Sequence, residues 1–158
     1  MALIVEDGTG KVDAESYVSI AELSDYATKQ GKSFPIAGDA ASAAEAAARR
    51  ATSWLDGFYA DRFPGRPTIQ DQALEWPRSE VMWRGVILGF DVIPAPIKRA
   101  CCEAAIRELA SPNSLSPDLV GTERVIREKV GDLEVQYADA SGVASARPII
   151  TEIDGILA

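Results

Sequence analysis

Residue types that could do chemistry occur in a few short runs of this 158-residue sequence. The run Gly8-Thr9-Gly10-Lys11 has the glycines and lysine of a phosphate-binding loop. It lacks the first glycine that such a loop needs, and no Ser or Thr follows the lysine. Glu75 and Glu80 could act as a pair of catalytic carboxylates. We expect a plain turn at residues 8–11 and solvated acids at the other two positions.

Other residues that commonly do catalysis or bind metals are scarce. The sequence contains no histidine, which removes the commonest general base and the commonest metal ligand. Cys101 and Cys102 are adjacent on an expected helix, so they cannot form an ordinary disulfide with each other, and they match no zinc spacing. We therefore expect buried thiols, no metal, no cofactor and no enzymatic activity.

Composition bounds the remaining possibilities. The length is that of one domain, and no apolar run is long enough to span a membrane. The start has no signal-peptide pattern, and the two unpaired cysteines indicate a reducing compartment. The net charge is −8, divided as −5 over residues 1–45, +1 over residues 46–110 and −4 over residues 111–158. A chain with this balance is a poor candidate for electrostatic capture of nucleic acid.

Apolar periodicity predicts a mainly α fold, a small bundle of three longer helices plus a short one. A capping box at Ser19–Glu22 begins the first helix, and Gly31 ends it. Apolar residues at steps of three and four predict the second helix over 44–58, with Asp39 or Ser42 as the cap. The short helix is expected at 69–75 and the third long helix from Ala95 to Leu109.

The last part of the chain predicts a β-hairpin and an arm. Strands are expected at 124–130 and 133–137, joined by Gly131-Asp132, with Lys129 opposite Glu134. The predicted domain therefore covers 1–137, and a flexible linker with an extended apolar C-terminal arm covers 138–158. We expect the arm to be loose in the free protein and to dock on a neighbouring subunit or another partner protein; the alternative is that it folds back on its own helices. The docking side chains would be Ile149, Ile150, Ile153, Ile156 and Leu157.

Between the second and third helices lies a segment, residues 54–84, that is rich in Trp, Arg and Pro. Single-stranded DNA binding needs aromatic side chains interleaved with positive charge. Residues 49–84 supply six arginines and several aromatics, but five acids nearly cancel the arginines. Trp54 and Phe58 also continue the apolar stripe of the second helix. The residues therefore favour a self-association interface, or ordinary surface ion pairs as the alternative, over a DNA platform.

Several short runs of the chain resemble a family of tailed-phage and prophage proteins. They are MALIVEDGTG, Ser16-Tyr17-Val18-Ser19, ALEWPRS and VGDLEVQYAD. Members are labelled "putative DnaT-like single-stranded-DNA-binding protein" and are similar to head–tail connector (adaptor) proteins. The resemblance covers residues 1 to about 139. Within ALEWPRS, we expect Trp76 and Arg78 to contact a partner.

The resemblance to connectors implies a structural virion protein. Such a protein would form a homo-oligomeric ring, commonly dodecameric, in the virion neck after synthesis in the cytoplasm of the host bacterium. It would bind the portal protein and tail-joining proteins, and double-stranded DNA would pass through its lumen without tight binding. The alternative is a DnaT-like single-stranded-DNA-binding module that acts in phage replication.

Overall fold

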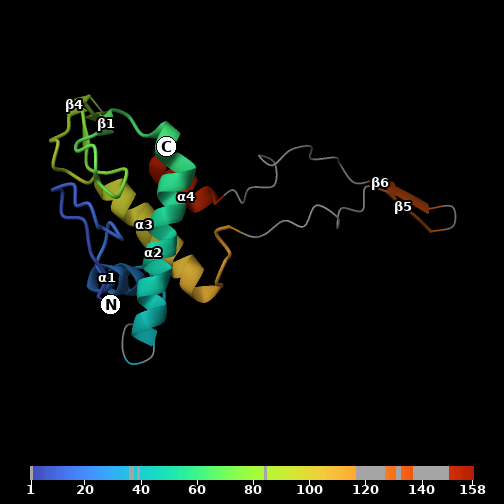
Figure 1. Ribbon diagram of the computed structural model, residues 1–158. Helices are drawn as coiled ribbons and strands as arrows, with labels where there is room; N and C mark the ends of the chain where they lie inside the picture. The colour runs from blue at the N-terminus through green and yellow to red at the C-terminus, as the bar shows by residue number, and fades with distance from the viewer. Residues whose placement is uncertain are drawn as a thin grey trace.

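The computed structural model describes residues 2–35, 38, 40–83, 85–116 and 150–158, and the backbone of 127–130 and 133–136. Helices dominate these residues, and α3 crosses behind α2 in the helical body (Figure 1). None of the described helices is long and apolar enough to cross a membrane. The helices are α1 (Ile20–Lys29), α2 (Ala40–Tyr59), η1 (Ala60–Arg62, a 3-10 helix), α3 (Ala95–Ala110) and α4 (Thr151–Leu157).

The core lies where α2 packs against α3. Small side chains on both helices allow this close packing, because they let the two backbones approach each other. Larger side chains close the ends of the interface, with Leu55 and Ile97 almost fully buried. The small buried residues are Ala44, Ala47, Ala48 and Ala51 on α2, and Ala100, Cys101, Ala104 and Ala105 on α3.

The three long helices confirm the periodicity prediction. The predicted capping box begins α1: the Ser19 hydroxyl accepts the Glu22 amide hydrogen, and the Glu22 carboxylate accepts the Ser19 amide. The second helix begins earlier than predicted, at Ala40. Ser42 therefore lies inside α2 and is not its cap, while Asp39 lies outside the described residues.

The predicted short helix at 69–75 is wrong, because this stretch forms turns. The side-chain amide of Gln72 explains the difference. Its oxygen accepts the Ile69 amide hydrogen, and its nitrogen donates to the carbonyls of Leu74 and Pro77. These bonds satisfy backbone groups that a helix would otherwise pair internally.

These turns connect the two strands of a small antiparallel hairpin, and a second small hairpin follows it. In the first, β1 (Arg66–Pro67) pairs with β2 (Arg78–Ser79). In the second, β3 (Met82–Trp83) pairs with β4 (Val86–Ile87). Strands of two residues carry no detectable alternation, so neither hairpin was predicted from the sequence.

The predicted C-terminal hairpin is confirmed where it is described. Strand β5 (Arg127–Val130) pairs with β6 (Leu133–Gln136), and Lys129 lies opposite Glu134 as predicted. The predicted extensions, residues 124–126 and Tyr137, lie outside the described residues, as do the turn 131–132 and most of the predicted linker.

The extended C-terminal arm needs correction over residues 150–158. Instead of an extended segment, the structure has the short helix α4, packed against α3. Ile153 is fully buried in the core, and Ile150 is 6% exposed. Burying these isoleucines removes apolar surface from water, which is why this part of the chain folds back on its own helices.

Candidate functional site

The glycine-rich loop at residues 8–11 is folded around a carboxylate of its own chain. Glu6 is 1% exposed. Its Oε1 accepts the amide hydrogens of Gly8 and Gly10, each at 2.9 Å, and its Oε2 accepts that of Lys11 at 2.7 Å. The amides that a phosphate would need are therefore already bonded, so the loop is a turn, as expected.

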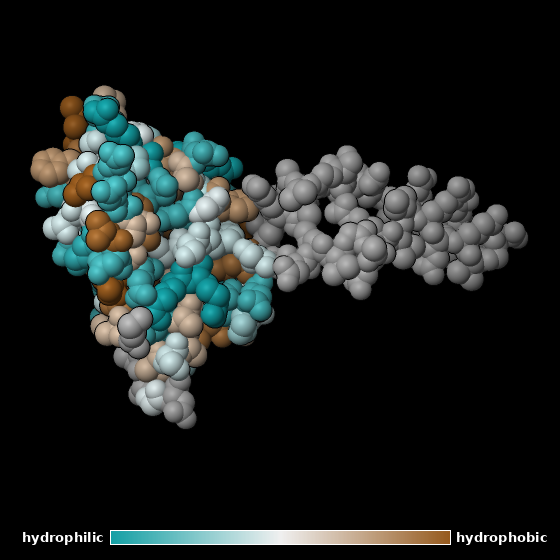
Figure 2. All heavy atoms as spheres, in the orientation of Figure 1, coloured by the Kyte–Doolittle hydropathy of each residue, from teal (hydrophilic) through white to brown (hydrophobic). Residues whose placement is uncertain are grey.

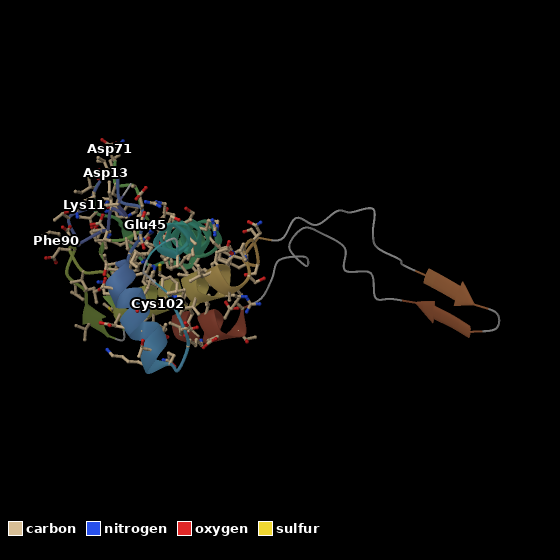
Figure 3. The ribbon with its side chains drawn as sticks, turned by 90° about the horizontal axis from the view of Figure 1, so that it is seen from below. Lys11, Asp13, Glu45, Asp71, Phe90 and Cys102 are labelled. Atoms are coloured by element: carbon tan, nitrogen blue, oxygen red, sulfur yellow. The ribbon has the colours of Figure 1, made fainter. Side chains whose placement is uncertain are left out.

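The two cysteines are buried side chains of α3, and Cys102 lies inside the helical body (Figure 3). Burial raises the pKa of the Cys101 thiol to about 11, and it also raises that of Cys102. A thiol held protonated is a weak nucleophile and a weak metal ligand. The described residues contain no group of three or more carboxylates or cysteines that could hold a metal ion.

The structure places Trp76 and Arg78, predicted to contact a partner, inside the protein. Trp76 is fully buried and is joined to Pro77 by a cis peptide bond. Arg78 is 6% exposed, donates to the carbonyls of Pro64 and Gly65, and pairs with Glu75 at 2.6 Å. Both side chains hold the 60–80 segment together and have little surface to offer a partner.

The residues predicted to bind through the arm are also mostly internal. Ile150 and Ile153 are buried, and Ile156 and Leu157 are half-buried against the core. Ile149 lies outside the described residues. While α4 stays packed on α3, these side chains are not a free docking surface.

The aromatic side chains of the 49–84 segment divide into core residues and pocket residues. Trp54, Tyr59 and Trp76 are buried, and Tyr59 also lines the pocket that the second group forms. Phe58, Phe63 and Trp83 are half-buried and line a pocket of about 550 Å³, called here the aromatic pocket. Its walls come from the end of α2, from η1, from β3, from the start of α3 and from α4, so distant parts of the sequence build one cavity.

Arg62 stands at the rim of the aromatic pocket. Its guanidinium lies 5.2 Å from the centroid of the Tyr59 ring, within range of a cation–π interaction. It also donates to Asp154 of α4 at 3.2 Å, and the Tyr59 hydroxyl donates to the same carboxylate at 2.9 Å. Burial and Asp154 raise the pKa of Tyr59, which keeps its hydroxyl protonated as a donor.

A second cavity of about 410 Å³ lies beside α2 and is called here the Glu108 pocket. Arg50, Ser53 and Trp54 line one side of it, and Glu108 and Asn113 line the other. Glu108 is 1% exposed, and its Oε1 accepts from Arg50 Nε at 2.6 Å. The pocket therefore combines an aromatic edge, a guanidinium and a buried carboxylate.

Most of the positive charge in the segment is already paired. Specific ion pairs balance the charges that the sequence predicted to cancel. As a result, little net positive potential remains to attract phosphates. Arg84 lies outside the described residues. The pairs are Arg49 with Glu15 and Glu45, Arg50 with Glu108, Arg62 with Asp154, Arg66 with Glu80, and Arg78 with Glu75.

An apolar surface covers the second small hairpin and the loop after it. We call it the hairpin surface and define it by Met82, Val86, Ile87, Phe90 and Val92, which are 40–77% exposed. Brown spheres lie at the upper left of Figure 2, where Figure 1 places β4. Phe90 points outward in Figure 3. Clustered exposed apolar side chains are typical of contact sites for other molecules.

Sequence reasoning named the aromatic residues of the pocket but missed the pocket itself. The missing parts were Asp154 and Leu157, which come from a segment that was expected to be loose. The spacing of four residues between Arg50, Trp54, Phe58 and Arg62 was the available signal, because it places them on one helix face.

Comparisons with known proteins give one match. A family model described as "Putative DnaT-like ssDNA binding protein" matches residues 1–158. No curated protein and no solved structure matches this chain.

Proposed function

Because the chain belongs to the family of putative DnaT-like single-stranded-DNA-binding proteins, we propose that it binds single-stranded DNA at the aromatic pocket. One observation of the structure supports this proposal. Phe58, Phe63 and Trp83 surround a cavity of about 550 Å³ and keep part of their surface accessible. An unpaired base has a flat apolar face that can stack on such side chains.

Stacking supplies most of the expected affinity. A base on an aromatic side chain contributes about 1–3 kcal/mol, and it does so with little regard to sequence. Arg62 is 66% exposed, and its ion pair with Asp154 is open to water. An exposed pair of this kind is worth about 0–1 kcal/mol, so a DNA phosphate can compete for the guanidinium.

Electrostatics limits the affinity. The net charge of −8 and the pairing of the five described arginines of residues 49–84 leave few counterions to release from DNA. We therefore expect weak binding at physiological salt, with a dissociation constant in the range of about 10⁻⁴ to 10⁻⁶ M.

Fluorescence anisotropy with a labelled oligothymidylate tests the proposal, with Trp83→Ala compared with Met82→Ala. The two residues are neighbours on β3, but only Trp83 lines the pocket. Loss of one stacking side chain weakens binding about 5- to 150-fold. Met82→Ala retains wild-type affinity. Equal affinities of the wild type, Trp83→Ala and Met82→Ala would show that the aromatic pocket is not the DNA-binding site.

Arg62→Gln and Arg66→Gln form a second matched pair. Both arginines are exposed and paired with one carboxylate, but Arg66 lies outside the aromatic pocket. The proposal expects weaker binding and a shallower salt dependence only for Arg62→Gln. An equal loss in both variants would point to general charge attraction instead.

A second candidate function is favoured by the hairpin surface. Its exposed apolar side chains suit a structural assembly protein, such as the head–tail connector that the sequence resembles. In that role, copies of the chain form a ring that binds the portal protein and tail-joining proteins.

Imaging of phage particles tests the idea, because a connector is present in the neck of every assembled particle. Ile87→Glu would then prevent ring assembly while leaving the monomer folded, since Ile87 is 77% exposed.

A further inference from the structure

The two pockets lie at the ends of one continuous face of α2. Arg50, Ser53, Trp54, Gly57 and Phe58 follow the i, i+3, i+4, i+7, i+8 spacing of a single helix face. The rings of Trp54, at the Glu108 pocket, and Phe58, at the aromatic pocket, stack with their centroids 5.3 Å apart. A stacked pair of rings therefore joins the lining of one cavity to the lining of the other.

The helix surface between the pockets is low and open. Ser53 and Gly57 are exposed, and no atom outside the local helix backbone lies within 4 Å of the position of a Cβ on Gly57. A polynucleotide backbone can approach a helix closely where side chains are this small. Larger residues at these positions would close the path.

A guanidinium stands at each end of this face. Arg50 uses Nε to hold Glu108, and its side chain is 46% exposed. Arg62, at the other end, uses Nη1 to hold Asp154. The two residues are twelve positions apart, with Arg50 on α2 and Arg62 on η1, which corresponds to roughly 18–20 Å along the two helices. About five stacked nucleotides span that distance, at 3.4 Å per nucleotide of one strand.

We propose that one single strand of DNA occupies both pockets at once, lying along α2 with its phosphates at Arg50 and Arg62. This inference rests on the proposed function. It adds a second contact site, the alignment of the strand along α2, and the number of nucleotides that the site covers. The strand passes over Ser53 and Gly57 between its two contacts. Its minimal length for full affinity is about five nucleotides.

The salt dependence of binding follows from this geometry. Two phosphate contacts predict a slope of about −1.4 in a plot of log affinity against log salt concentration, at about −0.7 per contact for a single strand. Losing the contact at Arg50 reduces the slope to about −0.7.

The experiment measures binding of oligothymidylates of increasing length, from two to eight nucleotides, by fluorescence anisotropy with the full chain. We expect affinity to rise with length up to about five or six nucleotides and then to level off. Arg50→Gln removes the gain from the longer oligonucleotides, while binding of the dinucleotide in the aromatic pocket is unchanged. The matched control is Arg107→Gln, because Arg107 is exposed on α3 and lines neither pocket.

A second variant guards against misfolding of Arg50→Gln, which removes the ion-pair partner of the buried Glu108 and leaves it only the Asn113 amide. Ser53→Phe keeps that ion pair and fills the Glu108 pocket with a ring. Its control is Ala43→Phe, at an exposed α2 position outside both pockets. Ser53→Phe should have the same length dependence as Arg50→Gln, and Ala43→Phe that of wild type.

The possible results separate the two proposals. If neither Arg50→Gln nor Ser53→Phe affects binding of long oligonucleotides, the strand does not occupy the Glu108 pocket. That result overturns this inference but leaves the aromatic pocket as the binding site. Absence of binding by any oligonucleotide, even at low salt, overturns the proposed function and this inference with it.

Discussion

The hydroxyl of Tyr59, at the end of α2, donates a 2.9 Å hydrogen bond to Asp154 of α4. The two residues are 95 positions apart in the sequence. This bond, together with the Arg62–Asp154 ion pair, fixes the last helix against the aromatic pocket. The same contact thus joins the packing of α4 to the shape of the candidate DNA site.

Ile153→Ala should strongly destabilise the protein. Ile153 is fully buried, and truncating a buried isoleucine to alanine costs about 2–5 kcal/mol through lost burial and the cavity that remains. Urea denaturation followed by circular dichroism measures the effect. The control Ile87→Ala, at a site 77% exposed, changes stability little. An unaffected Ile153→Ala would mean that α4 is detached in solution, as the sequence alone had suggested.

Asp56 should make stability depend on pH. Its carboxylate accepts from the Tyr17 hydroxyl at 2.5 Å and from the Glu75 amide at 3.1 Å. Burial raises its pKa from 3.8 to about 6, opposed by these hydrogen bonds and by Arg78, while Glu75 adds to the rise. The buried thiol of Cys101 also faces this group.

The folded state therefore binds the Asp56 proton more tightly than the unfolded chain does. The stabilisation is complete below about pH 4 and is lost as pH rises through about 6, a change of up to about 3 kcal/mol. Asp56→Asn removes the titrating group and flattens this part of the stability profile. Asp61→Asn, at an exposed neighbouring site, keeps the wild-type profile. A profile unchanged by Asp56→Asn would show that other groups set the pH dependence.

Two glycine-to-alanine changes should have opposite signs. Gly8 has φ of +101°, and a Cβ there would collide with the Asp91 carbonyl, so Gly8→Ala destabilises by more than about 1 kcal/mol. Gly57 lies within α2 with open space around its Cβ position, so Gly57→Ala stabilises by about 0.5–1 kcal/mol. Thermal denaturation compares both with wild type, and equal shifts would contradict the two local conformations.

Chelation should leave the melting temperature unchanged. The sequence has no histidine, and the described residues offer no cluster that could bind a metal. Differential scanning fluorimetry with and without EDTA, with elemental analysis of the dialysed protein, checks this expectation. A stoichiometric transition metal, or a lower melting temperature in EDTA, would contradict it.

The sequence predicted the elements whose signals are local. Alanine periodicity located α2, the Ser19–Glu22 capping box located the start of α1, and a Gly-X turn set the register of Lys129 opposite Glu134. The short helix at 69–75 failed because Gln72 bonds to the backbone in a way that propensity cannot represent.

The candidate site was less accessible to sequence reasoning, because its parts meet only through tertiary packing. The ion pair of Arg50 with Glu108 joins residues 58 positions apart, and the aromatic pocket needs Asp154 from α4. An apolar segment near the end of a chain fits a partner's groove and its own core equally well. Only the packing of α4 on α3 decides between them for Ile153.

The Glu6 carboxylate has a further consequence for the loop it organises. Three backbone amides that could otherwise bind a dissolved anion donate instead to the Glu6 carboxylate, which is covalently part of the chain. The local concentration of that ligand does not change with the nucleotide or phosphate content of the cell. The N-terminal loop is therefore permanently in its liganded form, and shortening Glu6 to alanine would create a vacancy that an added oxyanion could fill.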